Sequence, residues 1–167
     1  MNFLHAGRVG RPHGLDGSFH VTEPTPQLLR AGRTVLATGI EHEIVRRAGT
    51  DDRPIIRLSA ITDRASAAAL RGAELLCPRE NAPALEHDEW WAEDLERCRV
   101  VAGGRVLGQI SRVVALPSCE ALAVQAEGQE AEVLVPLIAD AVVRVDVSAG
   151  EVEVDLEFLG ADLLAPA

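Results

Sequence analysis

The feature that most restricts the fold of this chain is a pair of short segments in which valine alternates with charged residues. In residues 143–147 and 151–155 every second residue is Val, and the residues between them are Arg, Asp or Glu. A period of two places all the valines on one face of an extended strand. Only Ser148, Ala149 and Gly150 separate the two segments. The pattern therefore predicts an antiparallel hairpin with one buried face.

Short segments of similar strand-like character, separated by Gly, Pro and Asp, fill most of the remaining chain. One helix is predicted over residues 64–71, with Asp63 as its N-cap and Gly72 as its stop. Because no helical crossovers connect the strands, we expect a mainly all-β protein made of two small β-barrels in tandem. A short C-terminal helix is expected after Leu156. The predicted strands are residues 3–9, 18–23, 34–38, 43–47, 55–60 and 73–77, then 99–101, 106–116, 121–125, 132–135, 142–147 and 151–155, and the apolar residues of the C-terminal helix are Phe158, Leu159, Leu163 and Leu164.

The charge of the chain is divided unevenly between its two halves. Residues 1–85 hold eleven Arg and nine acidic residues, whereas residues 86–167 hold five Arg and seventeen acidic residues. The polar, proline-containing stretch between the halves is typical of a linker. We therefore predict a first barrel over residues 1–80, a linker over 81–89 and a second barrel over 90–167, and we expect the two barrels to face different partners.

Composition excludes several classes of protein. The net charge of -10 argues against a free-standing nucleic-acid-binding module. No signal peptide and no stretch of about 18 apolar residues is present, so we expect a cytoplasmic protein without a membrane anchor. We also expect a monomer. The three cysteines, Cys77, Cys98 and Cys119, lack metal-ligand or disulfide spacing and are predicted to be small buried residues. No metal ion or cofactor is predicted.

Glycines are most dense in residues 7–17, which lack the Gly-Lys-Ser/Thr or Gly-x-Gly-x-x-Gly patterns of phosphate-binding loops. One interpretation is a tight loop between two strands, in which glycine supplies positive φ angles. The other is that Arg8, Arg11 and His13 present cationic groups to an RNA backbone.

Catalytic motifs are absent, and we expect the protein not to be an enzyme. No Ser lies in a Gly-x-Ser-x-Gly elbow, and the five histidines have no metal-ligand spacing. The alternative is a small enzyme with a cleft between the two barrels and His13 or Cys119 as its reactive group.

Trp90 and Trp91, the only tryptophans, are adjacent at the end of the predicted linker. Neighbouring residues of an extended segment point to opposite sides. Either both are covered, one by each domain, or at least one belongs to a docking face, since Trp often anchors protein interfaces. Five acidic residues lie around the pair: Asp88, Glu89, Glu93, Asp94 and Glu96. An aromatic anchor with an acidic rim suits a basic partner.

Four segments, taken in order, resemble the ribosome maturation factor RimM family. Residues 9–17 are similar to its opening Gly-Arg…His-Gly-Leu-x-Gly stretch, and residues 62–75 to its Ala…Leu-Arg-Gly helix and closing strand. Residues 89–95 resemble its tandem aromatic pair and acidic-Leu step, with Trp where the family commonly has Tyr. Residues 134–138 with 145–155 resemble the end of its PRC-barrel.

This resemblance implies a non-enzymatic assembly factor with an N-terminal β-barrel and a C-terminal PRC-barrel. Such a factor binds the immature small ribosomal subunit through a basic protein of its head, small-subunit ribosomal protein nineteen. It aids the folding of the head and the processing of 16S ribosomal RNA. Carried onto this sequence, the tandem aromatic pair makes Trp90 and Trp91 the docking residues. A stand-alone RNA-binding module is the remaining alternative.

Overall fold

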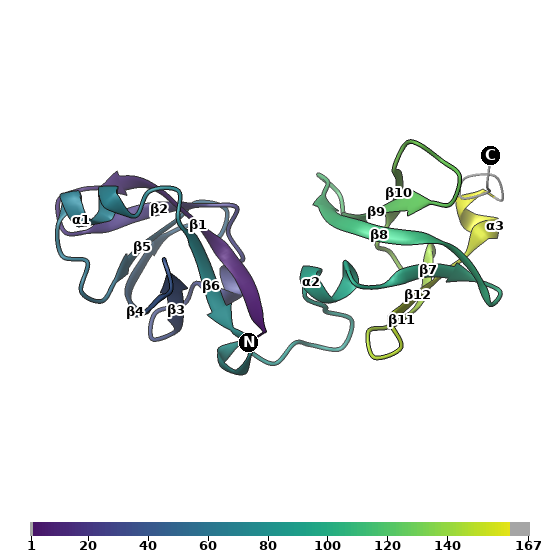
Figure 1. Ribbon diagram of the computed structural model, residues 1–167, viewed down its shortest axis with the longest axis horizontal. Coiled ribbons are helices and arrows are strands. Elements are labelled where there is room, and N and C mark those ends of the chain that lie inside the picture. Colours follow the sequence, from purple (N-terminus) through teal and green to yellow (C-terminus); the bar gives the residue numbers. More distant parts are fainter. Residues whose placement is uncertain (1, 161–167) are drawn as a thin grey trace. The chain divides into compact units, whose positions relative to one another are not determined.

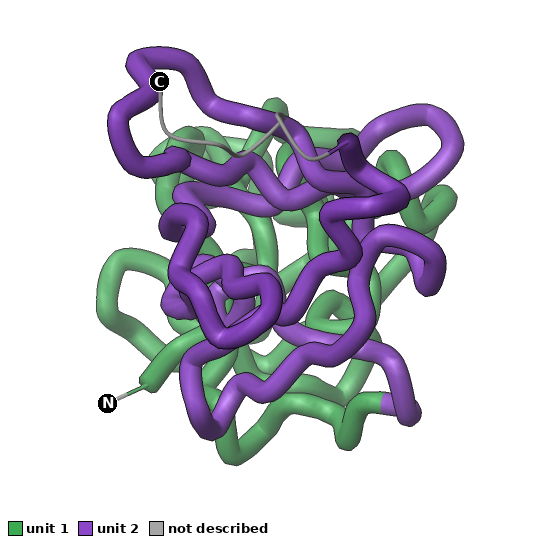
Figure 2. The backbone as a smooth tube through the Cα atoms, turned by 90° about the vertical axis from the view of Figure 1, so that its right-hand side faces the viewer, with its two compact units in different colours: residues 1–85 green, residues 86–167 purple. Residues whose placement is uncertain are grey.

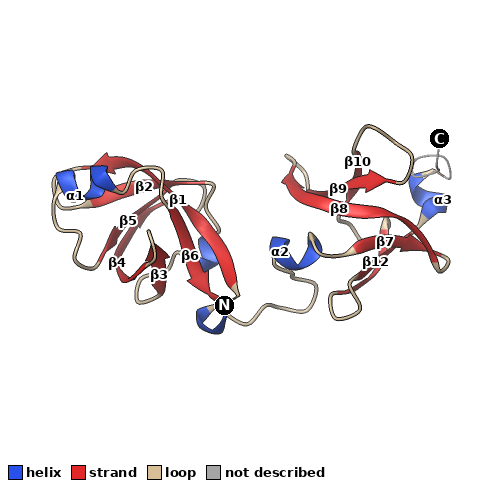
Figure 3. Cartoon of the chain, viewed as in Figure 1, coloured by secondary structure: helices blue, strands red, loops and turns tan. Residues whose placement is uncertain are grey.

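The chain divides into two compact units, residues 1–85 and 86–167, which Figure 2 shows in different colours. The computed structural model describes residues 2–160. Strands dominate both units, and the helices are short (Figure 3). The strands are β1 (Phe3–His13), β2 (Ser18–Thr22), β3 (Thr34–Ala37), β4 (Ile40–Gly49), β5 (Pro54–Leu58), β6 (Glu74–Pro78), β7 (Arg99–Ala102), β8 (Arg105–Ala115), β9 (Glu120–Ala126), β10 (Val133–Pro136), β11 (Val142–Asp146) and β12 (Glu151–Val154). The α-helices are α1 (Arg64–Ala69), α2 (Ala92–Leu95) and α3 (Leu156–Leu159), and two 3₁₀ turns cover Pro26–Leu28 and Arg79–Asn81.

The first unit is a closed barrel with the strand order β1-β2-β5-β4-β3-β6 (Figure 1). Its fully buried core includes Leu4, Phe19, Ile44, Ile56 and Leu75, which alternate with more exposed residues along their strands. Closure of the barrel removes the free sheet edges. The predicted helix is confirmed: Asp63 caps α1 by accepting a hydrogen bond from the Ser66 N–H at 2.8 Å.

The second unit is a six-stranded sheet with the order β10-β9-β8-β7-β12-β11. The sheet curls around its core as a half-barrel, and β10 and β11 form its two edges (Figure 1). The predicted antiparallel hairpin is confirmed, because β11 pairs with β12 and Val152 and Val154 are buried. The prediction of one buried valine face holds only in part, because the register shifts between Val142 and Arg144 and Val143 and Val147 are exposed. The hairpin therefore provides one edge strand of the sheet.

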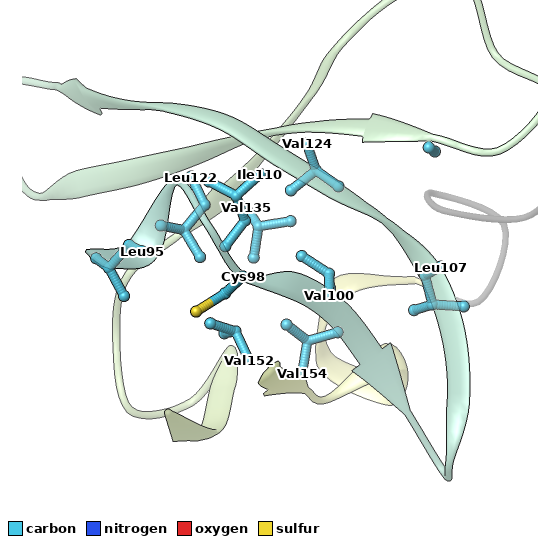
Figure 4. Close-up of a cluster of buried hydrophobic side chains, with 11 residues drawn as sticks. Leu95, Cys98, Val100, Leu107, Ile110, Leu122, Val124, Val135, Val152 and Val154 are labelled. Atoms are coloured by element: carbon cyan, nitrogen blue, oxygen red, sulfur yellow. The ribbon is translucent and has the colours of Figure 1, made fainter. Parts of the chain in front are cut away.

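Buried side chains of β7, β8, β9, β10 and β12, with Leu95 of α2 and Cys98, form the core of the second unit, which Figure 4 shows in close-up. Cys98 lies in this core, and its thiol donates a weak hydrogen bond to the Asp94 carbonyl oxygen (3.3 Å). Burial raises the pKa of the Cys98 thiol, and nearby Asp94 and Asp146 raise it further. The cysteine is thus a small apolar core residue, as its sequence context predicts.

Two details differ from the sequence predictions, and one prediction lies partly outside the described residues. β1 continues to His13, so the loop predicted over residues 7–17 is reduced to the turn at residues 14–17. Helix α2 was not predicted, because four residues are too few to show a helical period. The C-terminal helix is present as α3, whereas Leu163 and Leu164 lie outside the described residues.

Candidate protein-docking groove

A groove of about 650 Å³ lies on the second unit, between the segment that enters it and the edge strand β11. Its apolar lining comes from Trp90, from the β10–β11 connection and from the valines of β11. Its acidic lining comes from the residues that precede Trp90. The lining residues are Glu86, His87, Asp88, Glu89, Trp90, Leu137, Ile138, Ala139, Val142, Val143, Arg144 and Val145.

A tight turn holds the acidic side of this groove in place. The Glu89 N–H donates to the Glu86 carbonyl oxygen (3.3 Å), and the Glu89 carboxylate accepts from the Glu86 N–H (3.1 Å). Asp88 adopts a φ of +84°, a left-handed conformation that Asp tolerates better than most residues. Trp90 is the residue that directly follows this turn.

The two tryptophans have different environments. Trp91 is only 8% exposed and is the N-cap of α2, where its carbonyl oxygen accepts hydrogen bonds from the Asp94 N–H (3.0 Å) and the Leu95 N–H (3.3 Å). Trp90 is half-buried, packs against the core of the second unit and lines the groove. Of the pair, Trp90 therefore presents its surface to a ligand in the groove.

The predicted acidic rim is only partly gathered at the groove. Glu89 and Asp88 are exposed and line it, together with Glu86, which the sequence analysis did not select. Glu93 and Asp94 belong to α2, are half-buried and do not line the groove. A contact of Glu93 and Asp94 with a partner therefore stays a prediction that does not depend on this groove.

The basic residue of the groove is itself compensated by carboxylates. The Arg144 guanidinium pairs with Asp146 at 3.0 Å and with Glu153 at 3.8 Å, both within the hairpin. Its charge is therefore balanced locally, and the three carboxylates on the opposite side leave the groove with an excess of negative charge.

The predicted RNA-contact residues of the first unit are not equivalent. The Arg8 side chain donates to the Gly72 carbonyl oxygen at 3.0 Å and pairs with Glu74 at 3.1 Å and with Glu23 at 3.9 Å. These contacts bind β1 to the segment around β6. Arg8 therefore acts first as a structural tie within the barrel.

Arg11 is exposed and lines a second groove of about 910 Å³ on the first unit. Arg53 and Arg71, both exposed, line the same groove, which also contains the acidic residues Glu23 and Asp52. Sequence reasoning missed Arg53 and Arg71 because they come from the β4–β5 loop and the end of the α1 segment. Only the closed barrel brings these three arginines to one groove.

His13 is exposed at the end of β1, and its ring meets that of His20 edge-on, with ring centroids 5.2 Å apart. Burial lowers the pKa of His20, and the positive charges of Arg11 and His13 lower it further. The neutral form of His20 is thereby favoured beside Arg11.

The two residues named for the enzyme alternative belong to different units. His13 belongs to the first unit, whereas Cys119 lies half-buried in the β8–β9 turn of the second. Within residues 2–160, no cluster of three or more His, Cys, Asp or Glu side chains is arranged to hold a metal ion. None of the helices described is long and apolar enough to cross a membrane.

Comparison with known proteins gives consistent matches over nearly the whole chain. The RimM N-terminal domain model matches residues 4–82, and the RimM PRC barrel domain model matches residues 92–157. The ribosome maturation factor RimM of Anaeromyxobacter dehalogenans is 36% identical over 162 residues, covering 93% of this chain and 95% of that protein. The corresponding factor of a Roseiflexus species is 33% identical over 162 residues, covering 92% of this chain and 87% of that protein.

Among solved structures, the N-terminal domain of RimM from Thermus thermophilus is 26% identical and covers 52% of this chain and all of that domain, with a TM-score of 0.45. The two family models together span both units, and the curated relatives extend across the segment between them. The chain therefore belongs to the RimM family of ribosome maturation factors.

Proposed function

We propose that this protein binds the immature small ribosomal subunit by docking its second unit onto a basic protein of the subunit head, small-subunit ribosomal protein nineteen. The observation that carries the proposal is the groove in which Trp90 forms an apolar floor beside three carboxylates. Partly buried aromatic side chains anchor protein interfaces, and complementary charge steers the partners together.

The charge of the second unit supports the same kind of partner. With seventeen acidic residues against five Arg, residues 86–167 repel RNA and attract a basic protein. A ribosomal protein bound in this way is shielded from premature contacts with ribosomal RNA. The factor acts by shifting the populations of folding states of the head, which assists 16S ribosomal RNA processing without bond chemistry of its own. This mechanism requires no cofactor, and we propose that the protein acts as a cytoplasmic monomer.

Direct contact with ribosomal RNA is the second part of the proposal and belongs to the first unit. The sequence directs attention to Arg8, Arg11 and His13. Arg11 is the member of that set that lines a groove with two other exposed arginines. We propose that RNA phosphates contact the first unit at this groove, with Arg8 supporting the strand that presents Arg11.

Substitution of Trp90 tests the docking function. Trp90→Ala removes the floor of the groove, and we expect affinity for purified ribosomal protein nineteen to fall about 30-fold or more, as for an interface hot spot. Cosedimentation with immature small subunits should be lost in parallel. Phe158→Ala is the matched control, because Phe158 is an exposed aromatic residue of the same unit that does not line the groove.

Trp91 calls for a different measurement, because it is buried. Trp91→Ala is expected to destabilise the second unit by about 3–5 kcal/mol. A variant with both Trp90→Ala and Trp91→Ala would therefore confuse loss of docking with loss of folding. Full binding by a folded Trp90→Ala variant would refute the docking function.

A further inference from the structure

The strand β11 leaves one backbone edge of the second unit open. It pairs with β12 on one side, and β11 is the end strand of the sheet order. Outside that ladder, residues 143–146 make no backbone hydrogen bond to any other part of residues 2–160. Unpaired edge strands are templates for pairing with another chain.

The register of the sheet identifies which backbone groups face this edge. The Arg99 N–H donates to the Gly150 carbonyl oxygen (3.0 Å), and β12 runs parallel to β7 from that point. Backbone groups of successive strand residues alternate in direction, so Glu151 and Glu153 direct theirs toward β11. Their partners there are Asp146 and Arg144.

Val145 lies between these two partners and opposite Val152. The same alternation directs the N–H and C=O of Val145 away from β12, toward the open edge. Val143 is the extra residue of a bulge in the ladder, because the register shifts between Val142 and Arg144, and its side chain is 62% exposed. The edge therefore offers both backbone groups and apolar surface.

The docking groove runs along this same edge. Four consecutive residues of β11, Val142 to Val145, line one side of it, and residues 86–90 line the other. Four residues of extended chain span about 13 Å. The opposite edge of the sheet is protected differently, because β10 is short and ends in Pro136, which has no N–H to offer.

We propose that the partner inserts an extended, basic segment into this groove, where it adds to the sheet as a strand beside β11. Backbone hydrogen bonds to Val145 would then supply affinity, with apolar side chains of the segment on Trp90 and basic ones toward Glu86, Asp88 and Glu89. This inference rests on the proposed docking function and specifies how that site recognises its partner. The carboxylates on the far side of the groove are the reason for a basic occupant.

Amide hydrogen exchange on the full-length, ¹⁵N-labelled chain tests the inference, with purified ribosomal protein nineteen as the probe. Binding should slow exchange of the Val145 N–H by about tenfold or more, as expected for a new backbone hydrogen bond. The Arg144 and Asp146 amides, already paired with β12, should change less. If the Trp90 indole signal shifts on binding while Val145 exchange is unchanged, strand addition is wrong and docking stands. If neither changes, both are wrong.

A proline substitution provides a second test. Val145→Pro removes the outward N–H, and an edge strand tolerates proline at such a position. We expect about tenfold weaker binding, whereas Val145→Thr, which keeps the N–H and a branched side chain, should remain within about twofold. Thermal unfolding of both variants shows whether the fold is retained. Unchanged affinity in a folded Val145→Pro variant would overturn strand addition.

Discussion

The Glu89 carboxylate accepts a hydrogen bond from the Glu86 backbone N–H at 3.1 Å, and this contact closes the turn that delivers the chain to Trp90. The same carboxylate lines the docking groove. Glu89 thus combines two roles that substitution can separate. It shapes the backbone before the aromatic anchor, and it contributes negative charge toward a basic partner.

Two substitutions of Glu89 distinguish these roles. Glu89→Gln keeps an oxygen that accepts from the Glu86 N–H but removes the charge, whereas Glu89→Ala removes both. Because the Glu89 charge attracts the basic partner, both variants should bind ribosomal protein nineteen about two- to fivefold more weakly than wild type at low salt. This difference in affinity should decrease at high salt, which screens the attraction in the wild type. Isothermal titration at several salt concentrations measures this. A weaker affinity confined to Glu89→Ala would assign Glu89 to the turn alone.

Arg8 and Arg11, three residues apart on β1, are expected to respond differently to removal of their charge. Arg11→Gln should weaken binding of a single-stranded RNA oligonucleotide and reduce the slope of log affinity against log salt by about 0.7 for each phosphate that is no longer neutralised. Arg8→Gln breaks the ties to Gly72 and Glu74 and should lower the thermal stability of the first unit instead. Fluorescence anisotropy and thermal melts separate the two. Equal salt slopes for wild type and Arg11→Gln would exclude an RNA contact at Arg11.

Gly108 allows two strands of the second unit to approach closely. A Cβ at this position would clash with the Gln125 carbonyl oxygen, across the β8–β9 ladder. Gly108→Ala should therefore cost about 1–3 kcal/mol in the free energy of unfolding. Gly104→Ala is the control, because Gly104 has a φ of +79° and open space around it, so that a Cβ there is strained by the backbone conformation but meets no neighbour. We expect this control to cost about 1 kcal/mol in the free energy of unfolding. Urea unfolding ranks the variants, and equal costs would contradict the packing argument.

The sequence predicted the strands well because their signal is local. Alternating valines in β11 and β12 and the Asp63 cap of α1 each depend on residues close in the chain, and the structure retains them. The role of Gly108, in contrast, is close backbone approach. Such an approach is set by a neighbouring strand, which a local pattern does not report.

The site was harder to predict because its members meet only through the fold. Trp90 and Glu89 were selected for their unusual local sequence, but Val145 lies far along the chain and has the pattern of an ordinary strand residue. Similarly, Arg53 and Arg71 join Arg11 only when the barrel closes. The uneven charge of the two halves, which the sequence does show, supports the proposal of a basic partner for the acidic groove.

Asp63 provides a prediction for acid stability. Its carboxylate accepts hydrogen bonds from the Ser66 N–H (2.8 Å) and the Ser66 hydroxyl (2.9 Å), and the backbone bond is the larger reason that the pKa of Asp63 lies below its ordinary value. A pKa that is lower in the folded state stabilises the fold above the ordinary Asp pKa of about 4. That contribution is lost as the pH falls through the folded-state pKa.

Asp63→Asn keeps a cap but does not titrate. The melting temperature of this variant should therefore be lower than that of wild type at pH 7, and the difference should shrink as the pH falls below about 4. Asp52→Asn, which changes an exposed acidic residue of the β4–β5 loop, is the matched control for removal of one negative charge. Thermal melts of the three proteins between about pH 7 and pH 2 provide the comparison. If the difference in melting temperature between wild type and Asp63→Asn stays constant over this range, the charge of Asp63 does not stabilise the α1 cap.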